Sequence, residues 1–374
     1  MMDFSLSDEQ HAMAELAARI LADRCTLERL KAVEASDDRY DRQLWTEFAK
    51  AGLLGAALPE RVGGSEGGLV EICLLLEQQG RRVAMIPLLP VIVSAAMPLA
   101  RFGSAEQQQR YLPDVIAGKT LLTAALTELG SGSRAPACAA TRVGEAWRLS
   151  GVKVAVPMAH VAAVVLVPAR TPDGQVGVFL VDPQAPGVSL ERQETTNWES
   201  QWRMDLSDVA VGPDGVLGSL GEGASILNWI VDRSTVGLCA VASGTSQEAI
   251  RITAEYASNR KQFDKPIAMF QAVGQRMADS YIDNEAVNLT MWQAATRLAE
   301  EMPSAKEVAT AKYWAAEGGS RIGHAALHIH GGISIDVDYP IHRYFLWLKQ
   351  IEYTLGAATP QLVHLGELIA AEPA

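Results

Sequence analysis

A change in sequence pattern near residue 119 constrains the fold of this 374-residue chain more than any other feature. Up to about residue 118 the apolar residues recur mostly at helical spacing. The next hundred residues hold short segments rich in β-branched residues, separated by turn signals such as Thr171–Gln175. From Glu222 onward the pattern is helical again. Helices followed by strands and then longer helices indicate an α+β protein rather than an alternating one.

Capping signals place the ends of two N-terminal helices. Ser7 with Gln10 forms a capping box, and Ser104 with Gln107 forms a second one ahead of a stop near Gly118. The other expected elements are strands within 147–156, 160–169 and 176–182, and long helices over about 222–258, 268–300 and 304–328. The chain therefore divides into a helical N-terminal domain (1–118), a middle β-domain (119–221) and a helical C-terminal domain (222–374).

The overall charge excludes some functions. Lys and Arg number 32 against 44 Asp and Glu, and the net charge of -12 argues against nucleic acid or an anionic membrane as a partner. No segment approaches the roughly 18 consecutive apolar residues of a membrane helix. The N-terminus resembles no secretory signal, and the four cysteines form no metal or redox pair. A reduced, cytoplasmic protein is expected.

Three motifs carry the chemistry. Leu126–Arg134, LTELGSGSR, is a Gly/Ser loop in which small residues let backbone donors approach an anion or a flat ring. Ser258–Gln271, SNRKQFDKPIAMFQ, joins the end of one long helix to the start of another. His328–Phe345, HIHGGISIDVDYPIHRYF, contains Gly331 and Gly332, which permit close approach of the backbone. Taken alone, the Gly/Ser loop could be an ordinary turn. The second motif alone could be a helix C-terminus whose macrodipole favours Arg260 and Lys261.

Taken together, in this order and at these separations, the motifs resemble the acyl-CoA dehydrogenase family. The resemblance runs from FSLSDEQ to LVHLGELIA. It implies a helical N-terminal domain, a barrel-like middle β-domain, a C-terminal four-helix bundle, FAD as cofactor and tetramers built as pairs of dimers. It also implies the α,β-dehydrogenation of an acyl-CoA thioester, in which a base removes the α-proton and the flavin accepts the β-hydride.

The resemblance leaves both usual positions of the base without a carboxylate. The glutamate that most of the family places before a glycine aligns with Leu355, and the alternative position on the long helix aligns with Ser234. A leucine accepts no proton, and an unassisted serine hydroxyl is a poor base at neutral pH. Asp232 and Glu352 are close in sequence, but we expect both to be solvated surface carboxylates.

The family's contacts to the flavin ring are also altered. The resemblance places a flavin-packing Trp at Ala155 and a Thr that bonds near N5 at Pro157. Alanine offers little ring contact, and proline has no N–H and no hydroxyl. Arg134 replaces an expected Asp, whereas Thr127 and Ser133 match the family's flavin contacts. The chain's own isoalloxazine site is expected to be degraded.

A second set of FAD contacts is kept. In the family's dimers these residues reach the FAD held mainly by the neighbouring subunit, and here they match Arg260, Phe263, Gln271, His328, Gly331 and Gly332. An arginine beside a pyrophosphate supplies charge-assisted donors. His328 stands where the family has Gln, and Asp264 replaces a turn glycine, which Asp tolerates in a left-handed conformation.

This asymmetry predicts a base-lacking, non-catalytic subunit. Its expected partner is a homologous catalytic subunit in an α2β2 assembly, similar to those that actinobacteria use on CoA thioesters of steroid side chains. Two alternatives remain: an active homo-oligomeric dehydrogenase with an unusual base, and a flavin-free protein that binds CoA thioesters. His324, His328 and His330 suggest a metal site less strongly, because no carboxylate is suitably spaced.

Overall fold

The computed structural model describes residues 4–371 and divides into two compact units. The helical unit comprises Met1–Lys31, Cys73–Ala84 and Thr235–Ala374. The sheet unit comprises Ala32–Ile72 and Met85–Ser234. Three helices, α2 (Leu27–Glu34), α4 (Leu69–Arg82) and α7 (Gly223–Asn259), continue from one unit into the other.

The sheet unit is built around seven strands in the order β1-β4-β2-β3-β7-β6, with β5 paired to β4. Strand β4 pairs in parallel with β1 and, over a short stretch, with β2. The other strand pairs of this sheet are antiparallel. The strands are β1 (Leu121–Ala124), β2 (Ala139–Val143), β3 (Ala146–Pro157), β4 (Ala162–Arg170), β5 (Val176–Val181), β6 (Val188–Gln193) and β7 (Gln201–Val211). The expected barrel-like middle domain is therefore a curled sheet.

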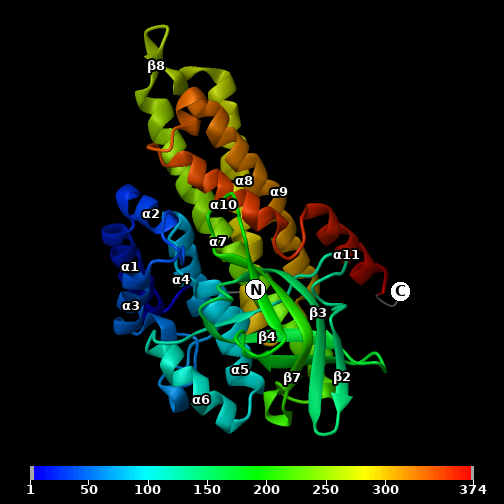
Figure 1. The fold of residues 1–374 in the computed structure, drawn as a ribbon. Helices are drawn as coiled ribbons and strands as arrows, with labels where there is room; N and C mark the ends of the chain where they lie inside the picture. Colours follow the sequence, from blue (N-terminus) through cyan, green and yellow to red (C-terminus); the bar gives the residue numbers. More distant parts are fainter. Residues whose placement is uncertain (1–3, 372–374) are drawn as a thin grey trace. The chain divides into compact units, whose positions relative to one another are not determined.

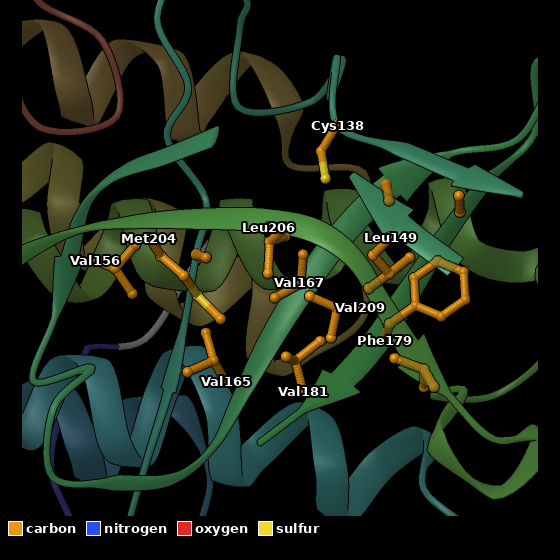
Figure 2. Packing of buried hydrophobic residues seen from close by; sticks show 14 of the residues in the cluster. Cys138, Leu149, Val156, Val165, Val167, Phe179, Val181, Met204, Leu206 and Val209 are labelled. Carbon is orange, nitrogen blue, oxygen red and sulfur yellow. The ribbon is translucent and has the colours of Figure 1, made fainter. Parts of the chain in front are cut away.

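Apolar side chains from several strands meet in one core. Val165 and Val167 of β4, Phe179 of β5, and Met204 and Leu206 of β7 point toward one another (Figure 2). All of these side chains are buried. The three expected strands are confirmed as β3, β4 and β5. Part of β3 alternates between buried and more exposed residues, whereas β4 and β5 are buried along almost their whole length.

Short helices complete the sheet unit. They are α3 (Arg42–Lys50), η1 (Leu53–Gly55), η2 (Glu60–Val62), η3 (Leu89–Ala96), α5 (Met97–Phe102), α6 (Ala105–Ile116), η4 (Pro213–Gly215) and η5 (Leu220–Glu222). The predicted capping box of Ser104 and Gln107 is present at the start of α6. The helix ends just before Gly118, whose φ of +70° suits glycine.

The helical unit contains α1 (Asp8–Arg24) and the long C-terminal helices. These are α8 (Gln271–Ala299), α9 (Ala305–His330), α10 (Ile341–Tyr353) and α11 (Ala358–Ala370), joined in part by β8 (Lys261–Gln262), β9 (Lys265–Pro266), η6 (Ile267–Met269) and η7 (Gly331–Ile335). Figure 1 shows α8 and α9 running alongside the later part of α7, with the β8 hairpin at one end. The predicted capping box at Ser7 and the three long helices are confirmed.

Two glycines let α4 and α7 approach within the helical unit. A Cβ at Gly80 would lie 2.2 Å from the carbonyl oxygen of Val241, and one at Gly244 would lie 1.9 Å from that of Glu77. Thr245 Oγ1 also donates to the Gly80 carbonyl at 3.3 Å. The two backbones are thus in contact. Within residues 4–371, no helix is long and apolar enough to cross a membrane.

Candidate cofactor and substrate site

The fold brings the Arg260 motif and the Gly331 motif together. The Tyr256 ring stacks on the His330 ring with centroids 4.4 Å apart, although the residues are 74 positions apart in sequence. The Tyr256 hydroxyl also donates to the His330 carbonyl at 3.3 Å. Arg260 follows the last turn of α7, and its backbone N–H donates to the Tyr256 carbonyl. Tyr256 and His330 therefore fix these two motifs as neighbours.

The segment after α7 forms a two-stranded hairpin with an exposed aromatic tip. Phe263 and Asp264 both have left-handed φ values, of 51° and 62°. The expectation that Asp264 adopts the glycine-like conformation is confirmed. The Phe263 side chain is 84% exposed, and its only ring contact among the described residues is with Phe270, at 6.2 Å between centroids. Such an aromatic side chain suits contact with another molecule.

The remaining residues of this set are also exposed. Gln271 is the first residue of α8, and Gly331 follows α9 with a φ of +64°. A Cβ built at Gly331 or Gly332 would meet no atom within 4 Å. The space beside both glycines is therefore open within the described residues. His328 lines an open cavity of about 810 Å³ between α8 and α9. These groups could all be reached by a ligand or a second chain.

A buried ion pair holds the Gly/Ser loop against strand β3. Lys153 Nζ lies 2.5 Å from Glu128 Oε1 and donates to the Pro168 carbonyl at 2.7 Å. Burial raises the pKa of Glu128, but the Lys153 ammonium and two backbone N–H groups outweigh it and bring the pKa below its usual value. The Thr127 carbonyl accepts from the Val154 N–H at 3.0 Å. Thr127 and Ser133 are both half-buried in this loop.

Arg134 binds helix α7 at the end of the same loop. Its guanidinium lies 2.5 Å from Asp232 Oδ1 and 3.2 Å from Asn228 Oδ1, one helical turn earlier. The side chain of Asp232 is only 20% exposed. The expectation of a solvated Asp232 is therefore wrong, because a sequence pattern cannot reveal a cation brought close by the fold.

Ala155 and Pro157 lie at an irregular end of strand β3. The pairing of β3 with β7 shifts register between Lys153 and Val156, and Ala155 adopts a left-handed φ of 50°. The exposed Ala155 donates its N–H to Gln193 Oε1 at 2.7 Å. Pro157 pairs with Gln201 but has no N–H to offer. Neither residue supplies a ring or a hydroxyl to a flavin.

Neither aligned base position offers an acid–base group. Ser234 is buried, and its hydroxyl lies 2.8 Å from that of Ser94 on η3. Leu355 follows α10 with a left-handed φ of 58°, and its carbonyl accepts from Gln361 Nε2 at 3.0 Å. An unassisted hydroxyl and an aliphatic side chain cannot take up a proton at neutral pH.

Glu352 is not a solvated carboxylate either. Its side chain is 18% exposed and lies 2.5 Å from Lys349 Nζ, which corrects the expectation from sequence. The last turn of α10 is held by Lys312 of α9, which is fully buried. Lys312 Nζ donates to the carbonyls of Ile351 at 3.0 Å and Glu352 at 3.1 Å, and burial lowers its pKa to about 8.

Sequence reasoning missed Lys312 and the pair of Glu128 and Lys153. A lysine in the apolar run Val308–Ala316 was the available signal for Lys312. No local sequence pattern indicates that Glu128 and Lys153 form an ion pair. The imidazoles of His324 and His330 each contact a backbone carbonyl one turn earlier in α9, at 2.8 Å. Within residues 4–371, no group of three potential ligands is placed to hold a metal ion.

Comparison with known proteins gives the family. Models of the acyl-CoA dehydrogenase N-terminal, middle and C-terminal domains match residues 7–119, 123–203 and 221–367. The acyl-CoA dehydrogenase FadE27 of Mycobacterium tuberculosis is 40% identical, and the alignment covers 100% of both chains. The protein belongs to the acyl-CoA dehydrogenase family.

Two solved structures share the fold closely. A chain of the ChsE4-ChsE5 complex of Mycobacterium tuberculosis is 40% identical over 100% of each chain, with a TM-score of 0.94. A chain of a Tcur3481-Tcur3483 steroid acyl-CoA dehydrogenase variant is 46% identical over 98% of this chain and 99% of that one, with a TM-score of 0.92. The predicted α+β fold and family are confirmed, and members of this family bind FAD.

Proposed function

We propose that this acyl-CoA dehydrogenase-family chain is the base-lacking subunit of an α2β2 complex. In this proposal a homologous catalytic subunit supplies the base and most of the FAD site. The present chain contributes Arg260, Phe263, Gln271, His328, Gly331 and Gly332 to that FAD. When bound, the flavin accepts the hydride removed from an acyl-CoA thioester. The role of this chain is to hold and orient the cofactor of its partner.

One observation carries the proposal: the residues aligned with cross-subunit FAD contacts are all exposed. The 84% exposure of Phe263 at a hairpin tip is costly for a lone domain and is explained if a partner covers the ring. Arg260 has the fork geometry that suits a pyrophosphate. Gly331 and Gly332 leave open space around their Cα atoms, as close approach of a cofactor requires.

The residues at the chain's own flavin position fit the cofactor poorly. Thr127 and Ser133 remain, but Ala155 and Pro157 offer no aromatic face and no hydroxyl. Arg134 is engaged by Asp232 and Asn228. Leu355 and Ser234 cannot remove an α-proton. An active enzyme with an unusual base finds no support in Asp232 or Glu352, since each is paired with a cation.

The proposed substrate is the CoA thioester of a steroid side chain. It is favoured by similarity to a steroid acyl-CoA dehydrogenase at 46% identity and to one chain of the ChsE4-ChsE5 complex. A cytoplasmic location forms part of the same proposal, because all four cysteines are free and a reducing compartment keeps thiols so.

The decisive experiment changes this chain and reads the flavin of the complex. Arg260→Ala removes charge-assisted hydrogen bonds worth about 1.5–3 kcal/mol each, equivalent to about a ten- to hundredfold loss of FAD affinity. Bound-flavin absorbance of the co-purified complex should fall and recover partly with excess FAD. Acyl-CoA oxidation in a dye-reduction assay should fall and recover together with the bound flavin. The subunit ratio measured by size-exclusion chromatography should stay unchanged.

Lys261→Ala is the matched control, because it removes the same charge one residue further along the exposed hairpin. It should leave flavin content nearly unchanged, as should Glu352→Gln. Loss of turnover in Glu352→Gln with full flavin retention in Arg260→Ala would reverse the roles assigned here. A yellow homotetramer of the isolated chain that oxidises an acyl-CoA would end the proposal.

A further inference from the structure

A second cavity, of about 500 Å³, lies in the helical unit and is lined by residues of α2, α4, α7 and α10 and by residues adjacent to these helices. The rings of Tyr256, Tyr339 and Tyr344 line it. Their hydroxyls are engaged by the protein: Tyr256 with the His330 carbonyl at 3.3 Å, Tyr344 with the Arg81 carbonyl at 3.0 Å, and Tyr339 with His330 Nε2 at 3.1 Å. The tyrosines therefore offer the cavity mainly aromatic carbon.

Aliphatic residues complete the apolar wall. Leu27 and Leu30 of α2 line the cavity, together with Ile252 of α7 and Val83. Val83 is 2% exposed and has a φ of 43°, a conformation that β-branched residues almost never adopt. Backbone strain of this kind is enriched at ligand sites, where the surrounding structure holds it in place. A volume of this size is typical of small-molecule pockets.

The charges around the cavity leave one cation unpaired. Arg251 is held by Glu248 at 2.9 Å and by Glu255 at 3.0 Å. Arg82 also lines the cavity and forms no hydrogen bond or ion pair with any residue between 4 and 371. Because both glutamates are paired with Arg251, Arg82 is the lining cation that a ligand with one negative charge could use as its counterion. A polyphosphate would place further negative charge beside Glu248 and Glu255, which is unfavourable.

We propose that this cavity binds an apolar monocarboxylate, with its body against the tyrosine and leucine wall and its carboxylate on Arg82. None of the residues assigned to the flavin lines this cavity, although Tyr256 and Asn259 of its wall closely precede Arg260 in the sequence. Because the lining residues differ from the flavin residues, variants at Arg82 and at Arg260 test the two proposals separately.

Isothermal titration calorimetry on the full chain co-purified with its partner subunit tests the site. Decanoate is the probe, 1-decanol provides the same tail without charge, and AMP represents a nucleotide anion. Decanoate should bind at least tenfold more tightly than decanol, and AMP should give no heat. Arg82→Met keeps the aliphatic stem, so it should weaken decanoate at least tenfold and leave decanol unchanged. The matched control is Arg19→Met, an exposed arginine of α1 outside the cavity, which should change neither affinity.

Leu27→Trp offers a second variant that leaves Arg82 in place. The larger side chain should occupy the apolar end and weaken decanoate and decanol together. Equal binding of decanoate and decanol to the unmodified complex would overturn the proposal. Tighter binding of AMP, absence of heat with decanoate, or unchanged decanoate affinity in Arg82→Met would also overturn it.

Discussion

Replacing Lys153 by methionine should destabilise the sheet unit strongly while leaving the surface unchanged. The Lys153 side chain is 1% exposed and that of Glu128 is 6% exposed. Methionine has nearly the volume of the lysine stem, so the main effect is a buried carboxylate without its countercharge. Breaking a buried pair from one side costs about 3–5 kcal/mol. For a unit of this size, about 2–4 °C of melting temperature per kcal/mol predicts a decrease of about 6–20 °C.

The double variant Lys153→Met/Glu128→Gln provides the matched comparison. Glutamine removes the uncompensated charge and can still accept from the backbone N–H groups of Ala137 and Cys138, which lie 2.7 Å and 3.1 Å from Glu128 Oε2. It should recover at least half of the lost melting temperature, because replacing both partners is far less costly than removing one. Thermal unfolding followed by tryptophan fluorescence measures both variants in the co-purified complex. A single variant within 2 °C of the unmodified protein, or a double variant as unstable as the single one, would refute the reasoning.

Three further predictions concern the helical unit. Burial lowers the pKa of Lys312 to about 8, so the folded chain releases this proton at lower pH than the unfolded chain, and stability should rise as pH increases from 7 to 10. Lys312→Met should remove most of that rise, about 2–3 kcal/mol of unfolding free energy, when urea unfolding curves are compared at the two pH values. Equal pH dependence of the variant and the unmodified protein would contradict the assignment. Gly244→Val should force α4 and α7 apart, because its Cβ would lie 1.9 Å from the Glu77 carbonyl oxygen. The same urea assay should show a loss of about 1–3 kcal/mol in the free energy of unfolding. Leu355→Glu should give the isolated chain no measurable acyl-CoA oxidation, since the flavin position is still incomplete, and substantial turnover by that variant would show that the flavin position is sufficient.

The amino-acid sequence by itself determined the class of fold and the ends of many elements. The capping boxes at Ser7 and Ser104 and the β-branched runs are signals written within a few neighbouring residues. Helix caps and strand alternation depend on such local spacing, so they can be predicted without knowledge of the fold. The left-handed turn at Asp264 was predicted differently, from a glycine that the family resemblance places there and from the tolerance of Asp for positive φ. The order of the three motifs was sufficient to indicate the family.

Tertiary structure alone decided which charged groups meet. Asp232 had the sequence pattern of a solvated carboxylate, but the fold places Arg134 against it, 98 positions away. The pair of Lys349 and Glu352 differs, because these residues are three positions apart on one helix and their contact is local. Lys312 reaches carbonyls 39 and 40 positions away, at the end of α10. Ion pairs and buried hydrogen bonds form between groups that packing brings together, and the energy of each depends on burial and on distance in space. A linear pattern specifies neither quantity, which is why these side chains acquired their roles only in the folded chain.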